Sequence, residues 1–281
     1  MKKILVTIVN YKSTKDTIEL LESMKTLAFK DYDVIVVDNN SNEDLSQLNK
    51  YKIKIIENKK NCGFTGAVNQ VFKQFKYDYY YLINPDTILH KDVLNNLLDT
   101  AEKNHAGFVG SAIYSYWDMK LVALAGRRNF ITGLAFPIKD INDAKELNGI
   151  TDYVDACSLL ISREVIDKVG LFDEKYFMYL ETEDLIARAK KENIKVITNP
   201  KAIVYHKGYG SSHGKKSKNT VYLLNKNRIY FMKKFLSPWK FSLFLLVNTF
   251  IVFPAMFLIY LLKGRFSLMI PLIKGNFTIW K

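Results

Sequence analysis

The last third of this sequence contains no acidic side chain. Glu192 is the final Asp or Glu, and residues 193–281 carry 15 Lys and Arg. Because the whole chain has a net charge of +13, residues 1–192 have a net charge of −2. Such a basic segment favours an anionic partner, and nucleic acid and an anionic membrane surface are the two candidates.

Cysteine is also scarce. Cys62 and Cys157 have neither disulfide nor metal-binding spacing, which excludes a disulfide framework and is typical of a reducing compartment. Residues 1–10 become polar too soon for a signal peptide, and we expect them to form a first strand. No segment is low in complexity, and 281 residues with 48% hydrophobic side chains predict one large domain, or one domain with an appendage.

The basic tail also contains the longest apolar run. Residues 241–262 are interrupted only by Ser242, Asn248, Thr249 and Pro254 and are long enough to cross ~30 Å of hydrocarbon. Residues 266–273 add a shorter apolar piece, and Trp239 and Trp280 flank the region as interfacial aromatics do. A core helix of a soluble protein is the alternative, but no uncovered sheet face remains for it. We therefore expect contact with a membrane, as one span or in its plane, and no binding of nucleic acid, for which no motif is present.

The rest of the chain predicts an α/β fold. Strands alternate with helices, which indicates a mostly parallel central sheet flanked by helices. The predicted strands are 4–9, 33–37, 53–56, 79–83, 108–113, 154–161, 195–198 and 202–205, and helices are expected at 163–169 and 220–235. We expect the α/β domain to span residues 1–214 and the membrane-associated region residues 215–281. Residues 114–150 have no clear period and are interpreted as an excursion over the open side of the sheet, where an acceptor could dock.

Polar side chains follow several predicted strands at their carboxyl ends: Asn10, Asp38, Asn58 and Asp86. In open α/β sheets, ligands bind in the crevice beyond these ends. Asp86 follows Asn84 and Pro85 in a stiff turn. A hard divalent cation that bridges substrate phosphates needs one or two such carboxylates, although a helix cap is the simpler interpretation of Asp86.

An acidic cluster opens the helix predicted after residue 180. Glu181, Glu183 and Asp184 surround Thr182. Acidic residues in a first turn are favoured by the helix dipole, so capping is one interpretation, and a general base at the mouth of a site is the other. Further on, His206 ends the last predicted strand, and residues 207–216 have the composition of a mobile lid over a phosphate-rich ligand.

Together, these stretches resemble glycosyltransferase family 2, the inverting enzymes of GT-A fold, and within it a rhamnosyltransferase-like branch of surface polysaccharide synthesis. The resemblance covers residues 3–210. Val6–Tyr11 is similar to the opening strand, Val37–Ser41 to the segment whose Asp reads the pyrimidine, and Asn61–Phe64 with Asn69 to a loop beside the nucleotide. The resemblance implies a nucleotide site formed by Val9, Asn10, Tyr11, Asp38, Asn61, Gly63, Asn69 and Asn84.

The resemblance also implies a metal site and a catalytic base. Residues 84–86 occupy the place of the Asp-x-Asp motif, so that Asp86, completed by His206, would hold Mn²⁺ or Mg²⁺. Residues 172–179 match the lead into the acidic motif, but Thr182 stands where the branch usually has its presumed base. We expect Glu183, and after it Glu181, to take that role, and Asp184 to orient Arg188.

The implied activity is metal-dependent, inverting transfer of a sugar, with rhamnose as one candidate. The donor would be a dTDP- or UDP-sugar, and the acceptor a hydroxyl of a lipid-linked glycan at the cytoplasmic face of the cell membrane. A nucleotidyltransferase is one alternative, although residues 10–13 offer no Gly-rich loop with a basic residue. A membrane-tethered sugar-nucleotide-binding protein without turnover is the other, and Thr182 keeps it open.

Overall fold

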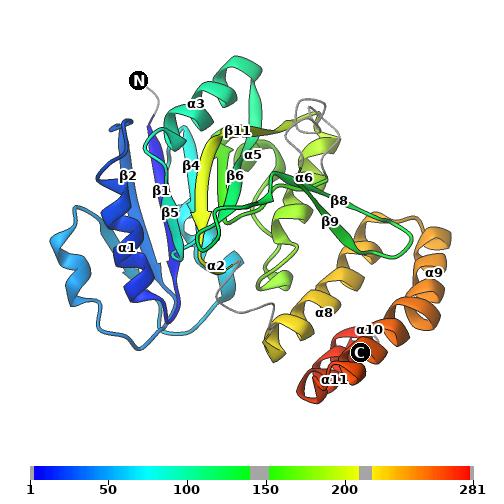
Figure 1. The fold of residues 1–281 in the computed structure, drawn as a ribbon. Coiled ribbons are helices and arrows are strands. Elements are labelled where there is room, and N and C mark those ends of the chain that lie inside the picture. The colour runs from blue at the N-terminus through cyan, green and yellow to red at the C-terminus, as the bar shows by residue number, and fades with distance from the viewer. Residues whose placement is uncertain (1–2, 140–151, 209–216, 279–281) are drawn as a thin grey trace. The chain divides into compact units, whose positions relative to one another are not determined.

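The computed structural model describes residues 3–139, 152–208 and 217–278. They divide into two compact units (Figure 1). The first comprises Met1–Gly126, Pro137–Phe177 and Glu181–His213, and the second Arg127–Phe136, Met178–Leu180 and Gly214–Lys281. The sequence did not suggest that the two short inner segments would group with the C-terminal region.

The first unit is built on one large sheet. Its strands run in the order β3-β2-β1-β4-β10-β6-β11-β5, with β7 paired to β6. Their bounds are β1 Ile4–Asn10, β2 Tyr32–Asp38, β3 Lys54–Glu57, β4 Tyr79–Ile83, β5 Thr87–Leu89, β6 Ala106–Ser115, β7 Leu121–Ala123, β10 Ser158–Ser162 and β11 Lys195–His206. β8 (Ala125–Arg128) and β9 (Ala135–Ile138) form a separate two-stranded sheet.

Helices cover both faces of the large sheet (Figure 1). Leu20 of α1 (Thr14–Met24) and Leu94 of α3 (Val93–Asn104) pack in the core on one face. The opposite core contains apolar residues of α2 (Gly63–Gln74), α5 (Arg163–Val169) and α6 (Glu181–Lys191). The strands are buried on both sides, which explains why they are nearly continuous apolar runs in the sequence.

The predicted α/β class is confirmed, and the structure adds the strand directions. β3, β2, β1 and β4 are all parallel, and β11 is parallel to β6. β10 lies antiparallel between β4 and β6, and β5 is antiparallel to β11. The sheet is therefore mixed in its second half.

One prediction about the strands is wrong. Residues 195–198 and 202–205 were expected as two strands, but they belong to the single strand β11. A register irregularity between Asn199 and Ile203, where both are paired to adjacent residues of β6, separates its two halves. Pro200 has no N–H for the ladder, and the strand accommodates it as an irregularity rather than ending there.

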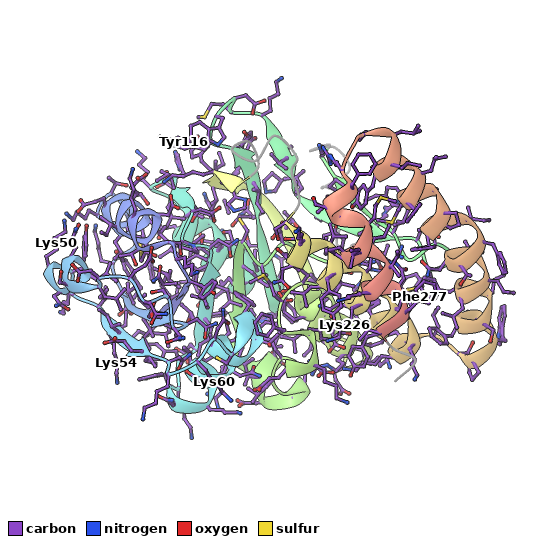
Figure 2. All side chains as sticks on the ribbon, turned by 90° about the horizontal axis from the view of Figure 1, so that it is seen from below. Lys50, Lys54, Lys60, Tyr116, Lys226 and Phe277 are labelled. Carbon is purple, nitrogen blue, oxygen red and sulfur yellow. The ribbon has the colours of Figure 1, made fainter. Side chains whose placement is uncertain are left out.

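Exposed lysines lie on and beside the edge strand of the first unit. β3 is the last strand of the sheet on its side, and Lys50, Lys54 and Lys60 are exposed in and around it (Figure 2). Charged side chains on an edge strand oppose pairing with a second chain.

The second unit is helical. It contains α8 (Lys218–Phe235), α9 (Pro238–Val247), a π-helical turn at Asn248–Val252, α10 (Phe253–Leu262) and α11 (Met269–Phe277). The stretch Pro238–Leu262 forms one helix of 25 residues, and an 18-residue window within it has a mean hydropathy of 2.3. By length and composition this helix could cross a membrane. Its buried residues, Phe244, Asn248, Val252 and Tyr260, are spaced by four or eight positions and so share one face, and the rest of its surface is largely exposed.

Two predictions concern residues outside the described ranges. The excursion of residues 114–150 includes residues 140–151, and the lid predicted at 207–216 includes residues 209–216. The described start of the excursion, β7, extends the sheet beside β6.

Candidate active site

The first polar pair of the site follows from strand register. β1 and β2 are parallel neighbours, and Asn10 is paired with Asp38 at their carboxyl ends. The Asn10 Nδ2 donates to the Asp38 Oδ1 at 2.7 Å, and the Ser41 N–H donates to the other carboxylate oxygen at 3.1 Å. Val9 and Asn84 are half-buried near these strand ends, and Tyr11 is exposed. Their contact with a nucleotide stays a prediction.

The loop before α2 is fixed by amides. Asn39 donates to the Asn61 Oδ1 and to the Gly63 carbonyl, both at 3.0 Å, and Asn61 accepts from the Gly63 N–H at 2.9 Å. Gly63 has φ of +75°, and a Cβ there would lie 2.4 Å from the Phe177 carbonyl oxygen. Both its backbone conformation and this close approach therefore require glycine.

Asn69 serves the fold of the same region. It is buried, and its Nδ2 donates to the Phe172 carbonyl and the Glu174 carboxylate at 3.0 and 2.9 Å, while its Oδ1 accepts from the Phe172 N–H at 3.0 Å. These contacts occupy its amide and hold the segment that leads to the acidic cluster. A direct contact between Asn69 and a nucleotide stays a prediction.

Asp86 and His206 meet because β5 and β11 pair. Thr87, the first residue of β5, lies opposite His206 at the end of β11. The His206 Nε2 is 3.0 Å from the Asp86 Oδ1. Burial on its own raises the pKa of Asp86, but the hydrogen bond and charge of His206 outweigh it, so that the pKa lies below its usual value. Asp86 precedes a strand, so the helix-cap interpretation of this residue is wrong.

The chain after His206 is held against α1. The Lys207 Nζ forms ion pairs with Asp16, at 2.8 Å, and with Glu19. Burial lowers the pKa of Lys207, but these two carboxylates more than compensate and raise it overall. A Cβ on Gly208 would lie 2.9 Å from the Asp86 Oδ2 and 3.2 Å from the His206 Cε1. Glycine thus allows the backbone at residue 208 to approach the Asp86–His206 pair this closely.

This pair fits a divalent cation that takes most of its ligands from elsewhere. Within the described residues, no group of three or more His, Cys, Asp or Glu could hold a metal. A carboxylate with a lowered pKa and a neighbouring imidazole supply two donors, and Mg²⁺ or Mn²⁺ would complete its shell with water and diphosphate oxygens.

Glu181 has the most perturbed carboxyl group of the acidic cluster. It is 6% exposed in the first turn of α6. Burial, and to a lesser degree the charges of Glu183 and Asp155, raise its pKa to about 7. Its Oε2 has no hydrogen-bond partner within the described part of the chain, and its Oε1 accepts a long bond of 3.5 Å from the Thr182 hydroxyl. A capping carboxylate would have its pKa lowered by the helix N-terminus, so capping does not explain Glu181.

The other two acids of the cluster differ from Glu181. Asp184 is fully buried, accepts from the Tyr176 hydroxyl at 3.1 Å and forms a 2.7 Å ion pair with Arg188. Arg188 also donates to the Val169 and Leu171 carbonyls. The predicted pairing of Asp184 with Arg188 is therefore confirmed. Glu183 is half-buried on the same turn.

The Asp86–His206 pair and the acidic cluster around Glu181 both lie close enough to residues 155–157 for their charges to interact. Burial raises the pKa of the Cys157 thiol, and the charges of Asp155 and Asp86 raise it further. Asp155 also acts on Glu181. In addition, the Asn84 N–H donates to the Cys157 carbonyl at 3.0 Å. Asp86 and Glu181 thus flank the same short segment before β10.

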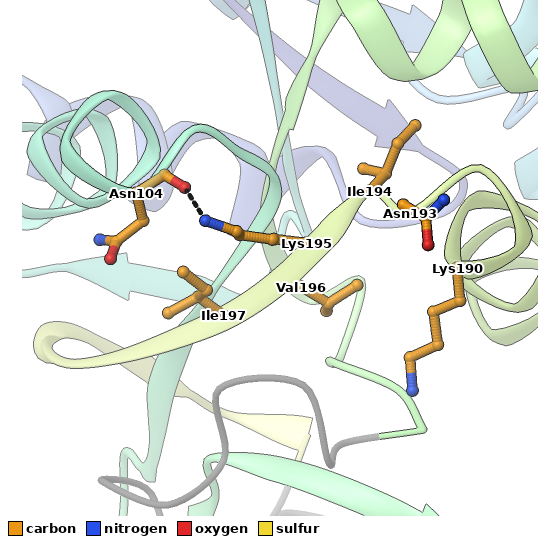
Figure 3. Close-up of a pocket in the computed structure, with 7 residues that line it drawn as sticks. All are labelled: Asn104, Lys190, Asn193, Ile194, Lys195, Val196 and Ile197. Carbon is orange, nitrogen blue, oxygen red and sulfur yellow. Dashed lines mark hydrogen bonds between the residues drawn. The ribbon is translucent and has the colours of Figure 1, made fainter.

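A separate cavity of about 430 Å³ lies at the other end of the sheet (Figure 3). Its lining comes from the ends of α3 and α6 and the start of β11, with Lys195 donating to the Asn104 carbonyl at 3.0 Å. The described residues of the lining include no carboxylate or imidazole, and the cavity lies at the amino ends of β6 and β11. Ligands of open α/β sheets bind at the carboxyl ends, so this cavity is not the candidate site.

The fold is that of a GT-A glycosyltransferase. A mannosyltransferase from Pyrobaculum calidifontis, solved with GDP-Man and Mn²⁺, superimposes with a TM-score of 0.62 over 98% of this chain and 86% of its own, at 10% identity. The family model "Glycosyl transferase family 2" matches residues 5–170, more than half of the sequence. The chain belongs to this family, which confirms the enzyme class expected from its motifs.

Two named relatives are similar over most of the chain. The low-salt glycan biosynthesis hexosyltransferase of Haloferax volcanii is 25% identical over 201 residues, which cover 68% of this chain and 62% of the relative. The N-acetylglucosaminyl-diphospho-decaprenol L-rhamnosyltransferase of Mycobacterium tuberculosis is 23% identical over 235 residues, 73% of this chain and 76% of that protein. The chain therefore spans less than two thirds of the first relative's length.

Proposed function

We propose that this protein transfers a sugar from a nucleotide-diphosphate donor to a hydroxyl of a lipid-linked glycan, with inversion at the anomeric carbon. The observation that carries this proposal is the constellation at the carboxyl edge of the sheet. A low-pKa carboxylate paired with His206 and a buried carboxyl group with a pKa of about 7 flank residues 155–157 in a family 2 member.

The nucleotide would lie along the ends of β1 and β2. Asn10, Asp38 and the Asn61–Gly63 loop are positioned by the hydrogen bonds described above, so that binding requires little reorganisation. We propose that Asp86 and His206 hold Mn²⁺ or Mg²⁺. The metal, when bound, neutralises the charge that develops on the diphosphate as it leaves.

We propose Glu181 as the general base, ahead of Glu183. A base works best when its pKa is near the working pH, and burial places the pKa of Glu181 at about 7. Glu181 would accept the acceptor's hydroxyl proton while that oxygen bonds to the anomeric carbon. The bond from the anomeric carbon to the diphosphate oxygen breaks in the same displacement, and the nucleoside diphosphate leaves. A single displacement inverts the anomeric centre.

We further propose that residues 215–281 attach residues 1–214, the catalytic domain, to the cytoplasmic face of the cell membrane. Trp239, Phe250 and Leu262 are 66%, 74% and 77% exposed on the apolar helix. Phe277 (Figure 2) belongs to a second exposed apolar stripe, formed with Phe266, Ile270 and Ile273. Apolar surface of this extent marks a binding face, and the lysines and arginines around it favour anionic lipids.

The relatives support a proposal for the sugar and its acceptor. A dTDP- or UDP-sugar, with rhamnose as one candidate sugar, is proposed as the donor. A lipid-linked glycan is proposed as the acceptor because the named M. tuberculosis relative acts on a diphospho-decaprenol compound.

Nucleotide binding can be tested by thermal unfolding of the full-length protein in neutral detergent. UDP and dTDP would be added with and without Mn²⁺ to wild type, Asp86→Ala and a control, Asp99→Ala, which removes an exposed carboxylate of α3. A ligand at 100 times its Kd stabilises by about 2.7 kcal/mol, or a Tm rise on the order of 5–10 °C. We expect one nucleotide to give a Mn²⁺-dependent shift in wild type and Asp99→Ala but not in Asp86→Ala. No shift with either nucleotide would remove the basis of the proposal.

A further inference from the structure

The second unit contains a buried arginine and no acidic residue. Its three segments, 127–136, 178–180 and 214–281, include 14 Lys and Arg but no Asp or Glu. Arg228, on α8, is 5% exposed. A buried guanidinium normally has a carboxylate partner, because an isolated charge loses its hydration without compensation.

The partners of Arg228 are all neutral. Its Nη2 donates to the side-chain oxygens of Asn225, Asn248 and Asn276, at 3.3, 2.6 and 3.3 Å, and its Nη1 donates to the Thr132 carbonyl at 3.4 Å. Its Nε has no hydrogen-bond partner among the described residues. The three amides orient the guanidinium, but they leave its charge uncompensated.

The π-helical turn contributes to this arrangement. Asn248 is its first residue, and it is buried while its neighbours Thr249 and Phe250 are exposed. The Asn248 Nδ2 donates to the Asn276 Oδ1 at 3.1 Å, and the Asn276 Nδ2 donates to the Asn225 Oδ1 at 3.3 Å. Such single π-helical turns within α-helices are frequent at functional sites.

Arg228 lines a cavity of about 200 Å³ within the second unit. Arg128, 7% exposed, lines the same cavity and donates to the Gly133 carbonyl. Burial, and then the neighbouring charge of Arg128, lower the pKa of Arg228 to about 10. Two guanidinium groups thus lie close enough to repel one another. The volume corresponds to roughly seven water molecules, which leaves room for a small anionic group.

Apart from Asn225, the remaining described lining is mostly apolar. It includes Leu180, Val221 and Leu224, and also Met256 and Tyr260 of the long apolar helix. A ligand for this cavity therefore combines a compact anion, for the guanidinium of Arg228, with an apolar part. Arginine pairs with phosphate through parallel hydrogen bonds, and the described partners of Arg228 are neutral.

We propose that this cavity binds the phosphate or diphosphate group of a lipid, with Arg228 as its ligand. This inference rests on the proposed function, since the lipid would be the one that carries the acceptor glycan. The apolar helix supplies the surface along which the lipid chain would lie.

The chain itself connects this cavity to the catalytic cluster. Leu180 lines the cavity and is followed directly by Glu181. Tyr179 and Leu180 have φ of +71° and +67°, a conformation that side chains rarely adopt. The Asn227 Nδ2 donates to the Met178 and Tyr179 carbonyls at 2.8 and 2.9 Å and holds this turn in place. A lipid phosphate bound beside Leu180 would contact the turn that positions the proposed base.

The test compares three probes on the full-length protein in neutral detergent micelles: geranylgeranyl diphosphate, the neutral alcohol geranylgeraniol and inorganic diphosphate. We expect geranylgeranyl diphosphate to raise the Tm of wild type at concentrations at which the other two have no effect. An equal response to the alcohol would overturn the arginine site, and an equal response to inorganic diphosphate would overturn its assignment to a lipid. This comparison uses the wild-type protein alone and therefore does not depend on the folding of an Arg228 variant.

Variants then identify the residue. Arg228→Gln is expected to weaken binding of geranylgeranyl diphosphate by about tenfold or more, the effect of losing a charge-assisted contact. Lys233→Gln removes the same charge from an exposed position of α8 and should bind like wild type. Arg228→Lys keeps the charge without the planar fork and should bind with intermediate affinity. Wild-type affinity in Arg228→Gln would contradict the proposal.

A nucleotide control separates the two proposals. The same wild-type preparation is tested with UDP and dTDP in the presence of Mn²⁺. A response to nucleotide without a response to geranylgeranyl diphosphate would overturn the lipid site alone. A response to the lipid without one to nucleotide would overturn the proposed function and leave a lipid-phosphate site.

Discussion

Replacing Glu181 by glutamine tests whether its carboxyl group is the poised base. The pKa of this group rises from an ordinary 4.5 to about 7 in the folded protein, mainly because it is buried. The difference corresponds to ~3 kcal/mol of folding free energy at 1.36 kcal/mol per pKa unit.

The sign of the effect depends on pH. Below about pH 4.5 Glu181 is protonated in both states, and its ionisation does not affect stability. Between about pH 4.5 and 7 the unfolded chain loses this proton while the folded protein keeps it, so that stability falls as the pH rises. Above pH 7 the folded protein contains the buried carboxylate and bears the full effect.

Glutamine has nearly the same shape and no charge at any pH. We therefore expect Glu181→Gln to resemble wild type in stability near pH 5 and to exceed it near pH 8 by up to ~3 kcal/mol. For a protein of this size, the Tm difference at pH 8 is on the order of 5–10 °C. Thermal unfolding at both pH values measures this Tm difference. Glu183→Gln, two residues further along the same helical turn, is the matched control.

The same variant should lose sugar transfer by a factor of roughly 10²–10⁴, the usual contribution of a general base. Wild-type turnover should rise with pH to a plateau, with a midpoint of about 7. If Glu181→Gln retains activity and Glu183→Gln loses it, Glu183 is the base. If the stability difference between Glu181→Gln and wild type does not change with pH, the raised pKa is refuted.

Three further variants test separate parts of the structure. Gly208→Ala places a methyl group 2.9 Å from the Asp86 carboxylate. It should weaken Mn²⁺-dependent nucleotide binding, measured by titration, by at least about tenfold. Unchanged binding would show that the metal and nucleotide do not use the side of Asp86 that faces Gly208. Arg188→Ala leaves Asp184 buried without its ion-pair partner. It should lower the free energy of unfolding, measured in urea, by about 3–5 kcal/mol. The double variant Arg188→Ala/Asp184→Leu should lose less, because it removes the buried charge. Asn227→Ala frees the turn before Glu181 and should lower kcat more than it changes nucleotide binding; equal effects on both would argue against a positioning role.

The predictable part of the site follows from parallel strands. Apolar runs that end in Asn10, Asp38 and Asp86 indicated which residues reach the same edge of the sheet, because parallel strands deliver their carboxyl ends together. The limits of β1, β2, β4 and α5 were also predicted closely. These features depend on local pattern, which the sequence displays directly.

Long-range pairings were not predictable in the same way. Lys207 binds Asp16 and Glu19, which are nearly two hundred positions earlier, and nothing in its neighbourhood distinguishes it from other lysines. The antiparallel insertion of β10 between β4 and β6 has the same origin, since a buried strand shows no direction in its composition.

Burial of polar groups was the other property that the sequence did not reveal. Residues 220–235 were predicted as a basic amphipathic helix, and in the structure Arg228 faces inward with three asparagines from α8, the π-helical turn and α11. Glu181 and Glu183 are also equivalent in sequence, and only their packing assigns the raised pKa to Glu181. We therefore propose Glu181 ahead of Glu183 as the base, whereas the sequence alone favoured Glu183.

The most direct test of the central claim is release of nucleoside diphosphate from a panel of dTDP- and UDP-sugars. Full-length protein is incubated with each donor, Mn²⁺ and a lipid extract that supplies polyprenyl-linked acceptors, and the released dTDP or UDP is measured with analysis of the glycolipid product. We predict release from one class of donor, an inverted anomeric linkage in the product, and loss of both on chelation of the metal and in Asp86→Ala and Glu181→Gln. Release that is unaffected by Asp86→Ala, or no release from any donor, would contradict the account.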